Sequence, residues 1–275
     1  MTKRKKVAKP ATTDVTSDEL GFPKYGNSDD ITNEKTQIIC ILDRSGSMAD
    51  KNVIVEAING FNNFLDEQKK LKDKATLTVA LFDDRHELLY DDVDIQKVEK
   101  ITRDTWSPRG MTALYDAIGK TINTAKANHA QLGTEKPTKV LVCIVTDGLE
   151  NASQEYNRDS IKKLIKQCED EDWSFVYLAA NQDAFDVGTS FGVSGGNTYT
   201  FAATTAGAYN MSMTLNNASV SYRGMSTHDA DYQQKKKSLI KQDKDKKDEP
   251  EDNAGNVTWS GNANFTINNS NMSNT

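Results

Sequence analysis

Residues 38–47, Ile38-Ile39-Cys40-Ile41-Leu42-Asp43-Arg44-Ser45-Gly46-Ser47, join an unbroken apolar run to a carboxylate and two serine hydroxyls. An apolar run of this length without helical periodicity predicts a strand that is buried on both faces. In an open α/β sheet, ligands bind at the edge where the strands have their carboxyl ends. The oxygens of Asp43, Ser45 and Ser47 therefore indicate a site for a hard cation such as Mg²⁺. Taken alone, the Asp-x-Ser-x-Ser pattern also fits a capped turn before a helix.

Two further loops present oxygen ligands next to elements of the expected kinds. Gly110-Met111-Thr112 opens a second helical pattern. Thr146-Asp147-Gly148 closes a second buried strand pattern at residues 140–145. The three loops together are much more specific for a metal site than any one of them, because short motifs taken singly are often false positives.

Strand and helix patterns alternate between residues 35 and 226. Helical spacing of apolar residues recurs at 54–65, 114–125, 161–168 and 208–222, and the strand patterns lie at 36–42, 75–82, 85–90, 140–146, 173–180 and 198–201. Such alternation requires crossover helices on both faces of a sheet. We therefore expect an α/β domain with a doubly wound, mostly parallel central sheet. Residues 85–90 follow the Asp83-Asp84 turn, so we expect them to form one antiparallel edge strand.

The two ends of the chain differ in composition from this central part. Residues 1–34 are polar with a basic start, and residues 227–275 are first charge-dense and then rich in Asn, Ser and Thr. Such segments bury too little apolar surface to offset the entropy of ordering them. We therefore predict a disordered arm at 1–34, one domain at 35–226 and a low-complexity tail at 227–275. The formal net charge of −6 argues against nucleic-acid binding as the main function.

The cysteines and the distribution of apolar residues bear on the cellular compartment. Cys40, Cys143 and Cys168 lie in apolar patterns, which predicts buried thiols rather than a disulfide framework or a zinc site. No apolar segment follows the basic start, and the sequence has no apolar stretch of 18 residues. We expect neither a signal peptide nor a membrane span, and a cytoplasmic protein in a reducing compartment.

The three loops resemble those of a von Willebrand factor A (vWA) domain with a metal-ion-dependent adhesion site (MIDAS). The matching residues are Asp43, Ser45 and Ser47 in the first loop, Thr112 in the second and Asp147 in the third, in the order that the family shows. The resemblance covers about residues 35–225, and both ends of the chain lie outside it. With its polar tails, the chain is similar to stand-alone vWA proteins of bacteria and their phages.

The resemblance implies a ligand set and a function. Ser45, Ser47 and Thr112 would bind a divalent cation directly or nearly so, and Asp43 and Asp147 would act partly through water. Mg²⁺ is the expected ion, with Mn²⁺ and Ca²⁺ as alternatives. With few direct carboxylates the cation stays electrophilic, so an Asp or Glu of a partner protein can complete its shell. The expected function is a non-enzymatic, metal-dependent protein–protein interaction module.

Two other functions stay open at this stage. One is a Mg²⁺-dependent phosphoester hydrolase, for which Glu150 or Asp83 would be the general base, although the sequence offers no dedicated nucleophile. The other is a structural role in assembly that depends on the C-terminal tail. The Asp83-Asp84 and Glu150 loops could also support a second cation, but a plain turn and loop are favoured. Arg44 is expected to lie in solvent, and the partner and the oligomeric state are left open.

Overall fold

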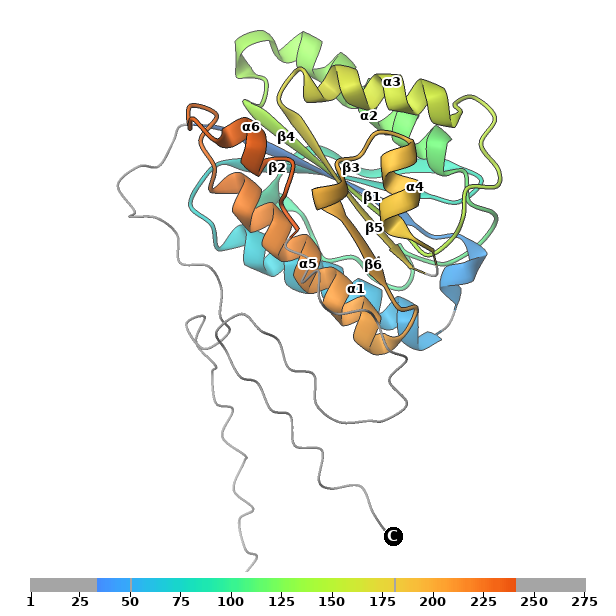
Figure 1. Ribbon diagram of the computed structural model, residues 1–275. Coiled ribbons are helices and arrows are strands. Elements are labelled where there is room, and N and C mark those ends of the chain that lie inside the picture. The colour runs from blue at the N-terminus through green and yellow to red at the C-terminus, as the bar shows by residue number, and fades with distance from the viewer. Residues whose placement is uncertain (1–33, 50, 181, 241–275) are drawn as a thin grey trace, which may run out of the picture. The chain divides into compact units, whose positions relative to one another are not determined.

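One six-stranded sheet forms the centre of the computed structural model, which describes residues 34–49, 51–180 and 182–240 (Figure 1). The strand order is β3-β2-β1-β4-β5-β6. Every neighbouring pair is parallel except β2 and β3, which are antiparallel. This order confirms the predicted doubly wound sheet with one antiparallel edge strand. The strands are β1 (Thr36–Asp43), β2 (Ala75–Phe82), β3 (His86–Asp94), β4 (Lys139–Thr146), β5 (Trp173–Ala180) and β6 (Thr198–Phe201).

Helices cover both faces of the sheet (Figure 1). On one face, α1 and α5 pack against alternate residues of β1 such as Ile38 and Cys40. On the other face, α2 packs against β1, α3 and α4 pack against β5, and Ile39 and Ile41 belong to the core cluster beneath them. Both faces of β1 are therefore buried, as its unbroken apolar run predicts. The helices are α1 (Lys51–Lys69), α2 (Leu114–Leu132), α3 (Arg158–Glu169), α4 (Ala184–Ser190), α5 (Thr205–Arg223) and α6 (Tyr232–Lys235), with the short 3-10 turns η2 (Gly46–Ala49), η3 (Ile95–Lys97), η4 (Gly133–Glu135) and η5 (Gly195–Asn197).

The packed region continues beyond residue 226, where the sequence pattern placed the start of the tail. Leu239 and Ile240 are buried in the same core cluster as α1 and α5. The Leu239 backbone N–H donates to the Asn197 side-chain oxygen at 2.7 Å, and Tyr232 is buried with its ring beside that of Tyr222. Buried apolar side chains and hydrogen bonds together hold residues 227–240 on the domain.

Three other predictions concern the cysteines, the two ends of the chain and membrane-spanning helices. Cys40, Cys143 and Cys168 are buried free thiols, as predicted. The predicted arm, apart from Glu34, and the tail from residue 241 lie outside the described residues. Among the helices within residues 34–240 that the structure describes, none has the length and apolar character needed to cross a membrane.

Candidate metal centre

Asp43 lies at the carboxyl end of β1 and is held from two sides. Its Oδ1 accepts a hydrogen bond from the Ser45 backbone N–H at 2.6 Å, and its Oδ2 accepts one from the Thr146 hydroxyl at 2.6 Å. The Trp106 indole N–H donates to the backbone oxygen of Asp43 at 2.9 Å. Because β1 and β4 are parallel neighbours, the loops that follow them meet at one edge of the sheet. This pairing brings Asp43 next to the Thr146-Asp147-Gly148 loop.

Hydroxyl groups lie between the loop that follows Asp43 and the Thr146-Asp147-Gly148 loop. The Ser45 and Ser47 hydroxyl oxygens lie 2.8 Å apart, and the Ser47 hydroxyl donates to the Asp147 carboxylate at 2.5 Å. Thr112 borders the same space, because a Cβ added at Gly148 would lie 2.9 Å from the Thr112 hydroxyl oxygen and 3.4 Å from that of Ser47. The side-chain oxygens of all three loops are thus close together, and a side chain at position 148 would crowd them.

The loop that carries Thr112 is fixed by backbone contacts. The Thr112 N–H donates to the Asn151 side-chain oxygen at 2.9 Å, and the Asn151 N–H donates to the Thr112 backbone oxygen at 3.0 Å. Gly110 has a φ of +68°, a conformation that glycine adopts without a steric penalty. The second loop is therefore locked against the third.

Asp43 and Asp147 have no cationic side chain to balance them among the described residues. Burial raises the pKa of Asp43 to about 6, opposed by hydrogen bonds from Thr146 and Ser45, and the negative charge of Asp147 raises it further. Burial also raises the pKa of Asp147, while the bond from Ser47 lowers it. Within the residues that the structure describes, neither carboxylate forms an ion pair with Lys, Arg or His. A divalent cation would remove this imbalance.

The chemistry of the donors fits a hard cation. The five side chains offer only oxygen atoms, and three of them are neutral hydroxyls. Over the described part of the chain, there is no cluster of three or more His, Cys, Asp or Glu that could hold a metal. A cation at this edge would therefore take hydroxyl oxygens and water beside the two carboxylates, a donor set that suits Mg²⁺, Mn²⁺ or Ca²⁺.

Comparisons with known proteins find distantly similar solved structures. No protein-family model matches the chain, and no curated protein matches it. Among solved structures, proximal thread matrix protein 1 of the mussel byssus is 18% identical over 66% of this chain and 45% of its own, with a TM-score of 0.46. The fold is vWA-like. This vWA-like domain spans less than half of the mussel protein.

Three further structures show the range of this likeness. Manganese-loaded TRAP protein of Plasmodium vivax is 18% identical over 65% of this chain and 72% of its own, with a TM-score of 0.48. The vWF domain of the pilus tip protein Mfa5 of Porphyromonas gingivalis is 11% identical over 66% of this chain and 95% of its own, with a TM-score of 0.45. Another mussel structure, 17% identical with a TM-score of 0.48 over 68% and 46% of the two chains, has a zinc-occupied MIDAS motif. At these identities the likeness concerns the fold alone.

Arg44 does not lie in solvent, so that prediction is wrong. Its side chain is buried in the vWA-like domain, and its Nε donates to Asp83 at 2.9 Å while its Nη1 donates to Glu87 at 2.7 Å. Arg44, which follows Asp43 in the sequence, is thus paired with other carboxylates. A sequence pattern cannot show this, because the partners of Arg44 are 39 and 43 residues away.

Asp83 and Glu150, the two candidates for a general base and two of the carboxylates considered for a second cation, are already engaged. Asp83 accepts hydrogen bonds from Arg44 and Arg109. Burial raises the pKa of Asp83, but the bonds from Arg109 and Arg85 and the two arginine charges lower it overall. Glu150 accepts bonds from the backbone N–H groups of Tyr115, Ala152 and Ser153. Both side chains serve the structure of the loops in this vWA-like domain.

Sequence patterns did not assign a role to three residues that support the site. Trp106 holds the backbone of Asp43, Thr146 holds its carboxylate, and Asn151 holds the Thr112 loop. The available signals were weak: Thr146 precedes Asp147, Asn151 comes four residues after it, and Trp106 is an isolated tryptophan in a polar stretch.

Proposed function

We propose that this vWA-like domain is a metal-dependent protein–protein interaction module. In this proposal Ser45, Ser47 and Thr112 hold a divalent cation directly, and Asp43 and Asp147 hold it through water and orient the hydroxyls. Mg²⁺ is the proposed ion, with Mn²⁺ and Ca²⁺ as alternatives. The bound cation would supply an open coordination position for an Asp or Glu carboxylate of the partner.

One observation supports the proposal most: two buried carboxylates lie beside a group of hydroxyls, and no cationic side chain of the described residues pairs with either. Burying charge without a partner is unfavourable, and fixed oxygens at one point are what a hard cation requires. The uncompensated charge of Asp43 and Asp147 therefore favours a cation site over a plain capped turn.

The surface beside the ligands also supports a protein partner. Met111 precedes Thr112 and is 57% exposed, and Leu149 follows Gly148 and is 62% exposed. Exposed apolar side chains that flank a polar site are common on protein-binding surfaces. The phosphoester hydrolase has less support, because both of its candidate bases, Asp83 and Glu150, are held by other groups.

The experiment is a thermal-shift titration of the full chain with Mg²⁺ and with Mn²⁺, in the presence and absence of acetate as a model carboxylate. Wild type is compared with Ser47→Ala and with the control Ser190→Ala, whose hydroxyl donates to the Val187 backbone oxygen within α4. A ligand that binds only the native state stabilises it by about 2.7 kcal/mol at 100 times its dissociation constant. We expect the midpoint to rise in wild type and in Ser190→Ala, and not in Ser47→Ala.

Acetate should raise the midpoint further only when the metal is present. A rise of equal size in all three proteins, or no rise in folded wild type, contradicts metal binding at this site. A metal-dependent rise with no added effect of acetate contradicts the carboxylate part of the proposal. Capture of partners with and without a chelator then identifies the protein that binds.

A further inference from the structure

Asp83 has an unusual position among the acidic residues of the domain. It follows β2 directly, its side chain is fully buried, and its Oδ2 accepts hydrogen bonds from two arginines. The bond from the Nε of Arg44 is 2.9 Å long, and the bond from the Nε of Arg109 is 2.7 Å long. One carboxylate oxygen thus joins an arginine of the first ligand loop to an arginine of the second.

The backbone connects the same three segments. The Asp83 backbone oxygen accepts from the Ala113 N–H at 2.9 Å, the Arg44 oxygen accepts from the Arg109 N–H at 2.7 Å, and the Gly46 N–H donates to the Gly110 oxygen at 3.1 Å. These bonds lie on both sides of the ligand positions in the sequence. Ser45 stands between Arg44 and Gly46, and Thr112 stands between Gly110 and Ala113.

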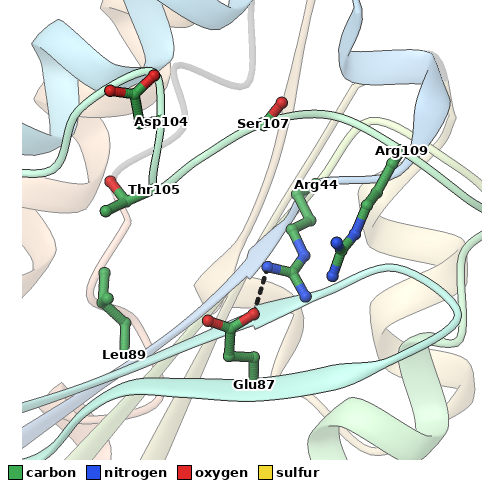
Figure 2. A pocket seen from close by; sticks show the side chains of 7 residues that line it. All are labelled: Arg44, Glu87, Leu89, Asp104, Thr105, Ser107 and Arg109. Carbon is green, nitrogen blue, oxygen red and sulfur yellow. Dashed lines mark hydrogen bonds and ion pairs between the residues drawn. The ribbon is translucent and has the colours of Figure 1, made fainter.

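The two arginine side chains lie side by side at this junction. Figure 2 shows the guanidinium groups of Arg44 and Arg109 next to each other at the wall of an open pocket of about 270 Å³, with Glu87 paired to Arg44. The two guanidinium charges repel each other, and each of them forms an ion pair with the Asp83 carboxylate. Without it, the buried guanidinium of Arg44 would keep only Glu87, which is half exposed.

We propose that Asp83 is a positioning residue for the metal centre. Its carboxylate holds Arg44 and Arg109, and through them it fixes the loops that present Ser45 and Thr112. It also holds the Arg44 cation away from Asp43, so that the ligand carboxylate stays available to a metal. This inference rests on the proposed metal site and adds a residue that would touch neither the cation nor its ligands.

The test compares Asp83→Asn with the matched control Asp73→Asn. Asp73 also accepts from a buried arginine, since the Arg223 Nε donates to it at 2.8 Å, but it lies before β2, near the amino-terminal edge of the sheet. Both variants should lower the midpoint of unfolding. The Mn²⁺ dissociation constant is then measured by electron paramagnetic resonance at a temperature where both proteins are folded. We expect it to rise at least tenfold in Asp83→Asn and to stay within twofold of wild type in Asp73→Asn.

Equal Mn²⁺ affinities in the two variants would overturn the proposal, because loss of stability alone would then explain the effect of Asp83→Asn. If Asp83→Asn does not fold, Arg109→Gln replaces it. Arg109 is half exposed, and its substitution removes one of the two arginine bonds to Asp83. A Mn²⁺ affinity of Arg109→Gln within twofold of wild type would overturn the proposal equally.

A second readout separates this inference from the proposed function. If wild type binds none of Mg²⁺, Mn²⁺ and Ca²⁺, the proposed function fails, and amide hydrogen exchange of the metal-free protein still tests the role of Asp83. The N–H groups of Gly46, Arg109 and Ala113 should exchange at least tenfold faster in Asp83→Asn and at the wild-type rate in Asp73→Asn. Unchanged exchange at these amides in Asp83→Asn would refute the positioning role.

Discussion

Replacing Asp43 by asparagine is predicted to stabilise the metal-free protein while it removes metal binding. The pKa of Asp43 is about 6 in the folded chain, against 3.8 for the free side chain, and burial is the main cause. At about 1.4 kcal/mol for each tenfold change, ionised Asp43 lowers the free energy of unfolding by about 3 kcal/mol at pH 7.5. An amide has no charge to bury, so Asp43→Asn escapes this penalty.

The hydrogen bonds around Asp43 can adapt to an amide. The amide oxygen can accept from the Ser45 N–H as the carboxylate does. The amide nitrogen would then donate to the Thr146 hydroxyl, which lies 3.0 Å from the Gly148 backbone oxygen and can donate to it instead. Because no bond need be lost, we expect a net gain of about 1–3 kcal/mol in metal-free protein.

The assay is urea unfolding of wild type and Asp43→Asn in a chelator, at several values of pH. The folded pKa is raised, so the folded protein binds more protons than the unfolded chain between about pH 4 and pH 6. The wild-type carboxylate therefore destabilises the fold fully above pH 6, and its effect falls below about 1 kcal/mol near pH 4. The difference in the free energy of unfolding between wild type and Asp43→Asn should therefore shrink as the pH falls from 6 to 4. Saturating Mg²⁺ should stabilise wild type only.

A single result would refute this reasoning. If Asp43→Asn is less stable than wild type in a chelator at pH 7.5, then burial of the Asp43 carboxylate does not destabilise the metal-free protein. The case for a metal centre would lose the observation on which it depends most.

Three further substitutions test other parts of the structure by urea unfolding. Asp116→Asn should lower the free energy of unfolding by about 1–3 kcal/mol at pH 7, because three consecutive backbone N–H groups donate to Asp116. Burial alone would raise the pKa of Asp116, but these hydrogen bonds lower it overall. The contribution of Asp116 to the free energy of unfolding should therefore disappear as the pH falls below about 4. A loss of stability in Asp116→Asn that does not change with pH would contradict this explanation. Gly110→Ala should cost more than Gly133→Ala, since both have positive φ but only at Gly110 would a Cβ meet another group, Asp84 at 1.9 Å; equal losses would show that the loop adapts. Leu239→Ala should cost about 2–4 kcal/mol, and an unchanged midpoint would mean that residues 227–240 do not belong to the core.

The sheet was predictable because its signal is local. Strands buried on both faces appear as apolar runs, and the pattern at 75–82 coincides with β2. The edge strand was predicted at 85–90, but β3 continues to Asp94. Asp91 and Asp92 carry no apolar alternation and lie at an irregularity of the register, and the strand is extended past them because Val93 and Asp94 pair with Leu77 and Thr76 of β2.

Residues whose role depends on distant partners were not predictable. Arg44 is buried only because Asp83 and Glu87, far along the chain, surround it. Lys139 is buried for a similar reason, because Glu34 and backbone oxygens near residue 225 receive its ammonium group. A charged residue in a sequence is normally assigned to the surface, and only tertiary contacts reverse that assignment.

The pairing of Arg44 with Asp83 and Glu87 explains why Arg44 does not balance the charge of Asp43. An arginine next to Asp43 in sequence would be the natural counter-ion, and it would compete with any metal for that carboxylate. In this structure, Asp83 and Glu87 bind its guanidinium instead. The result is a local excess of negative charge at Asp43 and Asp147, next to hydroxyls that can coordinate but cannot neutralise it. In the proposed function, a divalent cation would balance this charge and keep a coordination position for a partner's carboxylate, whereas a lysine or arginine in the same place would only balance the charge.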